Sequence, residues 1–167
     1  MTFLSAPWRW DFISRLIKKD GCVFCDALTL PEKESLICHR GNDYFVILNK
    51  YPYNTAHLMI VPYEHVDAPE KISPQKTVEM WELMNRSMAI IKEKFNPQGF
   101  NLGMNIGKVA GAGVKDHVHL HIVPRWDGDS NFMPIIGDTR VLSYSLTAIF
   151  DILSHAFKDH QAAVSKP

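Results

Sequence analysis

The chain has no excess of charge of either sign, because 18 basic residues balance 18 acidic residues and the formal net charge is zero. Without a basic block, nothing in the composition indicates binding to long nucleic acid or to an anionic membrane. A small anionic ligand is compatible with this balance, since a pocket needs only a few local donors. We therefore expect neither a nucleic-acid polymer nor a membrane among the partners.

The sequence also has no long hydrophobic run and little cysteine. No stretch approaches the roughly 20 apolar residues that a bilayer span requires, and the first residues contain neither an apolar signal core nor a small-residue cleavage site. The three cysteines, Cys22, Cys25 and Cys38, are an odd and sparse set for a secreted disulfide scaffold. These absences predict a cytoplasmic protein.

The length and the hydrophobic pattern predict a single domain over residues 1–167. Apolar residues three or four positions apart predict three helices, over residues 8–19, 73–95 and about 144–157, with a frayed tail beyond residue 160. Apolar runs between turn residues predict five strands, over residues 36–38, 44–48, 57–61, 100–106 and 116–124. This order favours an α+β domain in which helices pack on an antiparallel sheet.

Three histidines alternate along the last predicted strand. Because side chains alternate between the two faces of a strand, His117, His119 and His121 are expected on one face, with apolar residues on the other. One isolated histidine is usually a surface residue, but three at alternate positions bring their imidazoles together. An imidazole with a pKa of about 6.5 can act as nucleophile, acid or base near neutral pH. The pattern therefore predicts a reaction centre.

Metal binding is the competing interpretation of the same residues. A His-x-His pair on a strand can place two nitrogen ligands on one cation. Cys22 and Cys25 have the spacing of a zinc knuckle, which needs two more ligands, and His65 and His117 are candidates for them. That set would leave His119 and His121 free for chemistry. From spacing alone, the two cysteines can equally be ordinary buried thiols.

A glycine-rich loop over residues 107–113 leads directly into the histidine strand. Glycine lets backbone N–H groups approach phosphate closely, although glycines in such a loop more often serve a turn. The position of the loop beside the histidines favours a phosphate-binding role. Asn105, just upstream, can donate a hydrogen bond to phosphoryl oxygens or simply form a turn.

Residues 117–123 fit the alternating signature of the histidine triad (HIT) superfamily, His-φ-His-φ-His-φ-φ, where φ is apolar. Further segments resemble its diadenosine polyphosphate hydrolase and phosphorylase branch, which includes the fragile-histidine-triad-like proteins. These segments are residues 6–9, 21–25, 48–54, 57–62, 110–113 and 124–132, so that the resemblance covers roughly residues 6–140.

The resemblance implies a five-stranded antiparallel sheet with a long amphipathic helix and terminal helices, usually paired into a homodimer whose sheets join. It also implies cleavage of dinucleoside polyphosphates at an α-phosphate through a covalent nucleotidyl-histidine. Transfer to water makes the enzyme a hydrolase, and we favour it slightly because it needs no further anion site. Transfer to inorganic phosphate makes it a phosphorylase. A divalent metal such as Mg²⁺ can accompany the substrate.

Matched by position, His119 resembles the nucleophile, while His121 and His57 resemble the histidines that contact phosphate. The positions that resemble substrate contacts are Ile47 near the base, Asn49 at the ribose, and Asn105, Gly113 and Val114 around the scissile phosphate. Trp126, at the end of the histidine strand, is expected to bind substrate or to cover a dimer contact.

The zinc-bearing members of the family use two cysteines, a histidine after a Val-Pro turn and the first triad histidine. Here these are Cys22, Cys25, His65 and His117, which implies a structural zinc. Two alternatives to the covalent mechanism remain. One is a non-catalytic nucleotide-binding module, and the other is a hydrolase whose metal is held by the three triad histidines.

Overall fold

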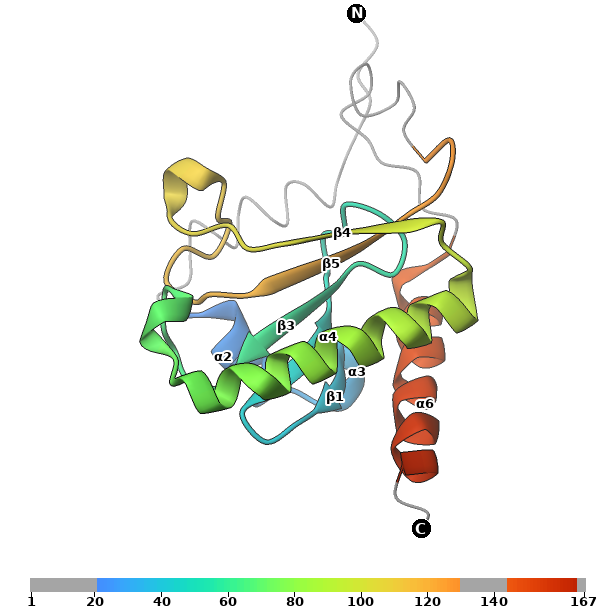
Figure 1. The fold of residues 1–167 in the computed structure, drawn as a ribbon, viewed down its shortest axis with the longest axis horizontal. Helices are drawn as coiled ribbons and strands as arrows, with labels where there is room; N and C mark the ends of the chain where they lie inside the picture. Colours follow the sequence, from blue (N-terminus) through green and yellow to red (C-terminus); the bar gives the residue numbers. More distant parts are fainter. Residues whose placement is uncertain (1–20, 130–143, 165–167) are drawn as a thin grey trace, which may run out of the picture.

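The computed structural model describes residues 21–129 and 144–164, and the helix predicted over residues 8–19 lies outside this range. A five-stranded sheet forms the centre of the molecule, with strand order β1-β2-β3-β5-β4 and every neighbouring pair antiparallel (Figure 1). The α+β fold with a five-stranded antiparallel sheet, predicted from the sequence, is confirmed. The strands are β1 (Ile37–Arg40), β2 (Tyr44–Leu48), β3 (Leu58–Pro62), β4 (Gly99–Gly103) and β5 (Leu120–Arg125).

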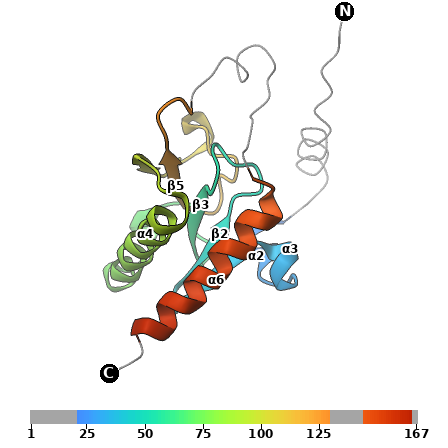
Figure 2. The same cartoon turned by 90° about the vertical axis from the view of Figure 1, so that its right-hand side faces the viewer.

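Both faces of the sheet are covered, and the alternation along the strands divides the core in two. On one face, Val46, Ile60 and Ile122 pack against the helices α4 (Pro74–Phe95) and α6 (Leu146–Val164). On the other face, Phe45 and other apolar residues pack against the short helix α2 (Val23–Ala27). Figure 2 shows α4 and α2 on opposite sides of the sheet. The face that packs on α4 and α6 is therefore mainly apolar, with His39 at its β1 edge, and the opposite face carries His121.

Helix α4 has nearly the bounds that the apolar spacing predicts. Pro74 occupies its first turn, where the missing N–H costs nothing. The helix ends at Asn96, which has a φ of 47° and adopts the left-handed conformation common at helix ends. Leu83, Ile90 and Ile91 turn toward the sheet and are buried. The helix thus braces the apolar face of the sheet.

The histidine strand differs from its prediction, because β5 begins at Leu120 and not at Asp116. The segment before it leaves the ladder and runs beside the chain that follows β3. The Val118 amide donates to the Val66 carbonyl at 2.7 Å, and the His117 ring reaches the Pro62 carbonyl. Proline cannot donate to a ladder, which ends β3 at Pro62. His117 and His119 are therefore held by individual contacts instead of by strand pairing.

Other boundaries also differ from the sequence expectations. Helix α2 and helix α3 (Glu32–Ser35) were not predicted, since four or five residues are too few to show a helical period. The glycine-rich loop contains a short 3₁₀ helix, η2 (Lys108–Ala110), and another, η1 (Pro69–Lys71), precedes α4. Helix α6 continues to Val164, so the chain just beyond residue 160 is helical where a frayed tail was expected. None of the described helices has the length and apolar character needed to cross a membrane.

Candidate active site and metal centre

His57, His119 and His121 meet on the face of the sheet opposite α4. His121 is on β5 and lies in register with Met59 of β3, which in turn is paired with Ile47 of β2. His57 directly precedes β3, and His119 directly precedes β5. The rings of His119 and His121 are 4.7 Å apart between centroids, and those of His57 and His121 are 5.0 Å apart. All three residues are buried, and the structure brings together the three imidazoles that the sequence analysis placed at one site.

The hydrogen bonds of His57 fix the tautomer of His121. The backbone N–H of Tyr53 donates to His57 Nδ1 at 3.0 Å, so this nitrogen carries no proton in the neutral ring. The proton is then on Nε2, which donates to His121 Nδ1 at 2.9 Å. His121 must in turn carry its proton on Nε2. A backbone amide thus determines, through His57, that His121 presents an N–H donor on its remaining nitrogen.

His119 has the opposite tautomer. Its Nδ1 lies 2.9 Å from the carbonyl oxygen of His117, and a carbonyl can only accept, so Nδ1 carries the proton. The other nitrogen, Nε2, is left with a lone pair. Two neighbouring rings therefore present complementary groups, a lone pair on His119 and an N–H on His121. This arrangement can deliver a nucleophile and a hydrogen-bond donor to the same phosphoryl group.

Burial keeps these rings neutral. Loss of solvent lowers the pKa of His119, although its hydrogen bond to the His117 carbonyl opposes that change. Burial, together with repulsion from His119, lowers the pKa of His121 to about 4. Near neutral pH each ring is therefore uncharged and carries a single N–H, and an imidazole must be uncharged to act as a nucleophile.

The lowered pKa of His121 predicts a pH-dependent stability. The unfolded chain binds a proton at this residue near pH 6.5, whereas the folded protein binds it only near pH 4. The neutral His121 ring thus makes its full contribution to the free energy of unfolding above pH 6.5, and this contribution is lost as the pH falls toward 4. We expect His121→Gln to lose less stability than the wild-type protein over this interval, measured as the urea midpoint. His155→Gln, the same exchange at an exposed position on α6, is the control measured beside it. Equal slopes for His121→Gln and wild type would contradict the assignment.

The four predicted metal ligands form a compact cluster. Cys22 directly precedes α2, Cys25 lies within it, and His65 and His117 approach from the chain beyond β3 and before β5. Their donor atoms all lie within 4.8 Å of one another. Cys22 Sγ is 3.2 Å from His117 Nδ1, while Cys25 Sγ is 3.4 Å from His65 Nδ1. A cluster that draws on three separate segments of the chain ties them together.

The geometry of this cluster fits a tetrahedral zinc ion. Zn–S bonds of about 2.3 Å and Zn–N bonds of about 2.0 Å place neighbouring ligand atoms roughly 3.3–3.8 Å apart. His117 also has the correct tautomer, because its Nε2–H points to the Pro62 carbonyl at 2.9 Å and leaves Nδ1 free to bind a metal. Among the described residues, the cluster includes His117 of the triad but neither His119 nor His121.

Phe24 lies between the candidate metal cluster and the His119 ring. Its ring, carried by α2, lies 5.4 Å from the His117 ring and 4.8 Å from the His119 ring, measured between centroids. The sequence analysis assigned this residue no role, although it stands between the two cysteines. Phe24 and Tyr53 are neighbours of the histidines to which the sequence analysis gave no role. Neither a ring contact between segments that are distant in sequence nor a main-chain donor leaves a pattern that the sequence shows.

Some of the predicted substrate contacts lie beside the histidines, and for others the structure shows no contact with them. Asn49 lies at the site, with its side-chain nitrogen 3.3 Å from His57 Nδ1 and its oxygen accepting from the Tyr51 amide. Ile47 is in the same row as His121, through Met59. Asn105 is half-buried and makes no hydrogen bond with the described residues. A Cβ built on Gly113 would meet open space, whereas Val114 packs on the core beneath α2.

Trp126 is not brought to the histidines. Its indole N–H donates to the Phe95 carbonyl at the end of α4, at 3.1 Å. Side chains alternate between the two faces along β5 and the residue after it. Trp126 therefore lies on the same face of the sheet as Ile122, which faces α4, and on the opposite face from His121. In this structure the indole therefore fixes the end of α4 against the sheet.

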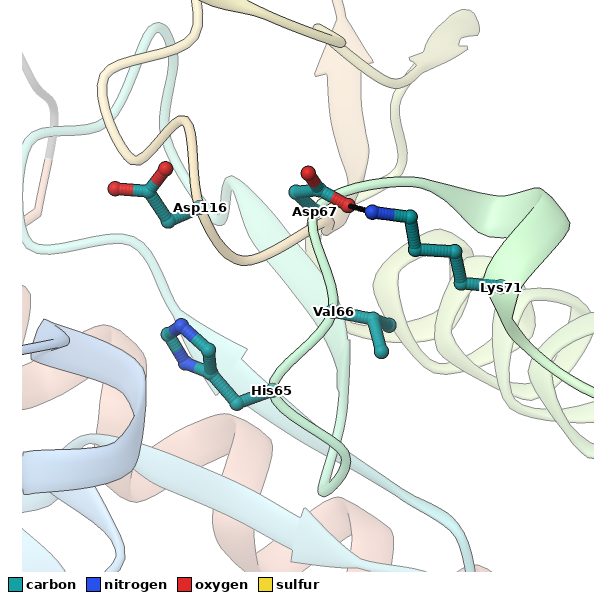
Figure 3. A pocket seen from close by; sticks show the side chains of 5 residues that line it. All are labelled: His65, Val66, Asp67, Lys71 and Asp116. Carbon is teal, nitrogen blue, oxygen red and sulfur yellow. Dashed lines mark ion pairs between the residues drawn. The ribbon is translucent and has the colours of Figure 1, made fainter.

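A cavity of about 270 Å³ opens on the outer side of the metal cluster (Figure 3). It is lined by His65, Val66, Asp67, Lys71 and Asp116. Asp67 forms an ion pair with Lys71 at 2.6 Å, so this carboxylate is already partnered. His57, His119 and His121 do not line the cavity, so it belongs to the surroundings of the candidate metal cluster and not to those of the three histidines.

A five-stranded antiparallel sheet that gathers alternate histidines at the start of one strand defines a histidine triad domain. The family model described as the HIT domain matches residues 31–128, and the chain belongs to this family. It is 35% identical over 147 residues to the AP-4-A phosphorylase of Mycobacterium tuberculosis, covering 83% of this chain and 75% of the relative. It is 30% identical over 81 residues to the bis(5'-adenosyl)-triphosphatase of Dictyostelium discoideum, covering 48% of this chain and 54% of that protein.

A solved structure has the same fold. It is that of a zinc-bound histidine triad family protein from Mycobacterium smegmatis, with a TM-score of 0.68 and 24% sequence identity. The match covers 86% of this chain and 97% of that one. Likeness at this level of identity establishes the fold.

Proposed function

We propose that this protein transfers a nucleotidyl group from a dinucleoside polyphosphate, such as diadenosine tetraphosphate, to an acceptor through a covalent bond to His119. The observation that carries the proposal is the pair of complementary tautomers, with a lone pair on His119 Nε2 and an N–H on His121 Nε2. The relatives named as acting on diadenosine polyphosphates supply the substrate class. A phosphoric anhydride has both the electrophilic phosphorus and the anionic oxygens that these two groups suit.

In the first step, the lone pair of His119 Nε2 attacks the α-phosphorus and the bond to the bridging oxygen breaks. The leaving nucleoside polyphosphate takes the bonding electrons, and His121 Nε2–H stabilises the phosphoryl oxygens. Removing one such donor typically raises a barrier by about 3 kcal/mol. A divalent cation such as Mg²⁺ on the phosphates would neutralise part of the leaving charge. In the second step the acceptor attacks the same phosphorus, and the bond to His119 breaks.

The remaining predicted contacts fit this substrate. Asn49 would hold the ribose hydroxyls and Ile47 would lie near the base, while Asn105 and the backbone at Gly113 and Val114 would donate to the phosphates. Asn105 has hydrogen-bonding capacity to spare, as its side chain has no partner among the described residues. Trp126 enters this proposal only as a support of α4.

The acceptor is water in a hydrolase and inorganic phosphate in a phosphorylase. The chain is 35% identical to an AP-4-A phosphorylase over a match that covers 83% of its length, which supports inorganic phosphate as the second candidate for the acceptor. A single assay separates the two: diadenosine tetraphosphate is incubated with the protein, with and without inorganic phosphate. Hydrolysis gives AMP and ATP in both samples, whereas phosphorolysis gives ADP and ATP only with phosphate. Tight nucleotide binding without any product would instead support the non-catalytic module and end the proposal.

We also propose a structural zinc in the Cys22, Cys25, His65 and His117 cluster, whose contribution is to hold these segments together. Free cysteines used as ligands suit the reducing cytoplasm, where we expect the protein to act. A homodimer with joined sheets is the expected assembly. Strand β4 is at one end of the strand order and its last three residues are exposed, as a strand that pairs with a second sheet would require.

A further inference from the structure

We propose that Asp129 is a positioning residue, which sets the tautomers of His57 and His121 by clamping the loop of residues 49–57 to the end of β5. The inference rests on the proposed function, because it assigns a cause to the N–H that His121 presents to substrate. Asp129 itself touches none of the histidines in the interactions described above. Its effect would pass through hydrogen bonds of the loop.

The Asp129 carboxylate is a buried junction of several donors. Its side chain is only 9% exposed and accepts from Arg125 Nε and Nη2, both at 2.7 Å. The same carboxylate accepts from the Trp126 amide at 3.0 Å and from the Asn54 side chain at 2.8 Å. Charge-assisted bonds to a little-exposed carboxylate are among the stronger hydrogen bonds in proteins. Asp129 therefore fixes the position of Asn54 relative to β5.

Asn54 carries this restraint into the loop. Its side-chain nitrogen also donates to the Pro124 carbonyl at 3.2 Å, and its side-chain oxygen accepts from the Thr55 amide. Its own carbonyl accepts from the backbone N–H of His57 at 3.3 Å. The residue before it, Tyr53, supplies the amide that occupies His57 Nδ1. The described hydrogen bonds thus connect Asp129 to His57 through Asn54 and its immediate neighbours.

The loop needs such a restraint for two reasons. Tyr53 is 48% exposed, so burial fixes only part of this residue, the ring that lies 4.8 Å from the His57 ring and 5.6 Å from the His121 ring between centroids. Ala56 has a φ of 56°, in the left-handed region that costs an alanine roughly 1–2 kcal/mol. Strained conformations persist only where the surrounding contacts fix them. Asn54 directly follows Tyr53 and lies two residues before Ala56, which is itself fully buried, so the clamp adds to the contacts that hold this part of the loop.

The far side of the clamp is anchored to the sheet. Arg125 Nη1 donates to the Asn101 side chain on β4 at 2.8 Å, while its other two nitrogens hold Asp129. Asp129 and Arg125 together therefore connect the loop to β5 and, through Arg125, to β4. If Asn54 is released, the Tyr53 amide is no longer held at His57 Nδ1, and the Asn49 side-chain nitrogen, at the longer distance of 3.3 Å, is a second group that faces this nitrogen. With the shorter hydrogen bond lost, Nδ1 can take the ring proton. His57 Nε2 then accepts instead of donating, and His121 loses its N–H toward substrate.

The test replaces Asp129 by asparagine, with Asp127→Asn as the matched control. Asp127 is exposed in the same turn, and it is engaged through its backbone amide, which donates to the Gln98 side chain. We expect Asp129→Asn to lower kcat on diadenosine tetraphosphate by roughly 10- to 100-fold, with a KM change below about threefold. The imidazole ¹⁵N signals of His57 and His121 should move from their wild-type tautomer pattern. Asp127→Asn should match wild type in kcat and in the signals.

Asn54→Ala tests the other end of the same hydrogen bond and decides the matter if Asp129→Asn does not fold. It should shift the same ¹⁵N signals and lower kcat to a similar extent. Unchanged His57 and His121 signals in a folded variant of either residue would overturn the positioning role. The signals are read without substrate, so they test the clamp even if wild-type protein cleaves no dinucleotide, an outcome that would defeat only the proposed function.

Discussion

Replacement of His119 by alanine is expected to lower kcat on diadenosine tetraphosphate by at least about 10⁴-fold, the scale seen when a covalent nucleophile is removed. His119 is the one ring of the cluster whose Nε2 is left with a lone pair, because its Nδ1–H is held by the His117 carbonyl. His121 cannot substitute, since its hydrogen bond from His57 leaves it with an N–H. Substrate binding should persist, because the donors around the phosphates remain.

Two measurements make this prediction decisive. Nucleotide affinity, measured by calorimetry, should change little in His119→Ala, and the melting temperature shows whether the variant is folded. His155→Ala, at an exposed position on α6, is the control and should retain wild-type kcat. With labelled substrate, wild-type protein quenched in alkaline detergent should carry a covalent nucleotide that His119→Ala lacks. Turnover by the variant within tenfold of wild type would rule out His119 as the nucleophile.

Replacement of Cys22 by serine is expected to remove the bound zinc and to destabilise the fold by more than about 4 kcal/mol, as loss of a structural metal does. Cys22, on the N-terminal side of α2, and His117, next to the histidine strand, are tied through this cluster. Without the ion, two buried or half-buried groups lose their common partner. The melting temperature should fall on the order of 10 °C.

The control for Cys22→Ser is Cys38→Ala, which removes a thiol from the core on the other face of the sheet. Metal analysis should find one zinc per chain in the wild type and in Cys38→Ala, and none in Cys22→Ser. Retention of a full equivalent of zinc by Cys22→Ser would show that the ion is bound elsewhere. If it were lost from His119→Ala or His121→Gln instead, the metal would belong to the triad.

The regular helices and strands of this fold could be predicted because the spacing of their apolar residues shows which faces are buried. In α4, apolar residues three and four apart mark the face that covers the sheet, and in β2 a continuous apolar run marks a strand covered on both faces. The start of β5 could not be predicted in this way. His117 and Val118 look like strand residues, but their partners are Pro62 and Val66, and those contacts exist only after the chain has folded.

The candidate site shows the same division. Histidines at alternate positions, and cysteines two residues apart, could be recognised because their chemistry is carried by the side chains. Tyr53 and Asn54 could not be given roles, although the family resemblance includes their segment. Tyr53 acts through its backbone amide, which every residue other than proline possesses, and Asn54 acts through a carboxylate that is distant in sequence.

The hydrogen bond between His119 Nδ1 and the His117 carbonyl also bears on the lifetime of the intermediate. Once a nucleotidyl group is attached to Nε2, the imidazole ring becomes cationic. A peptide oxygen stabilises that cation only through its dipole, whereas a carboxylate in its place would neutralise the charge. The ring consequently remains a good leaving group. A main-chain acceptor thus favours rapid release of the nucleotide to the second substrate over its storage on the protein.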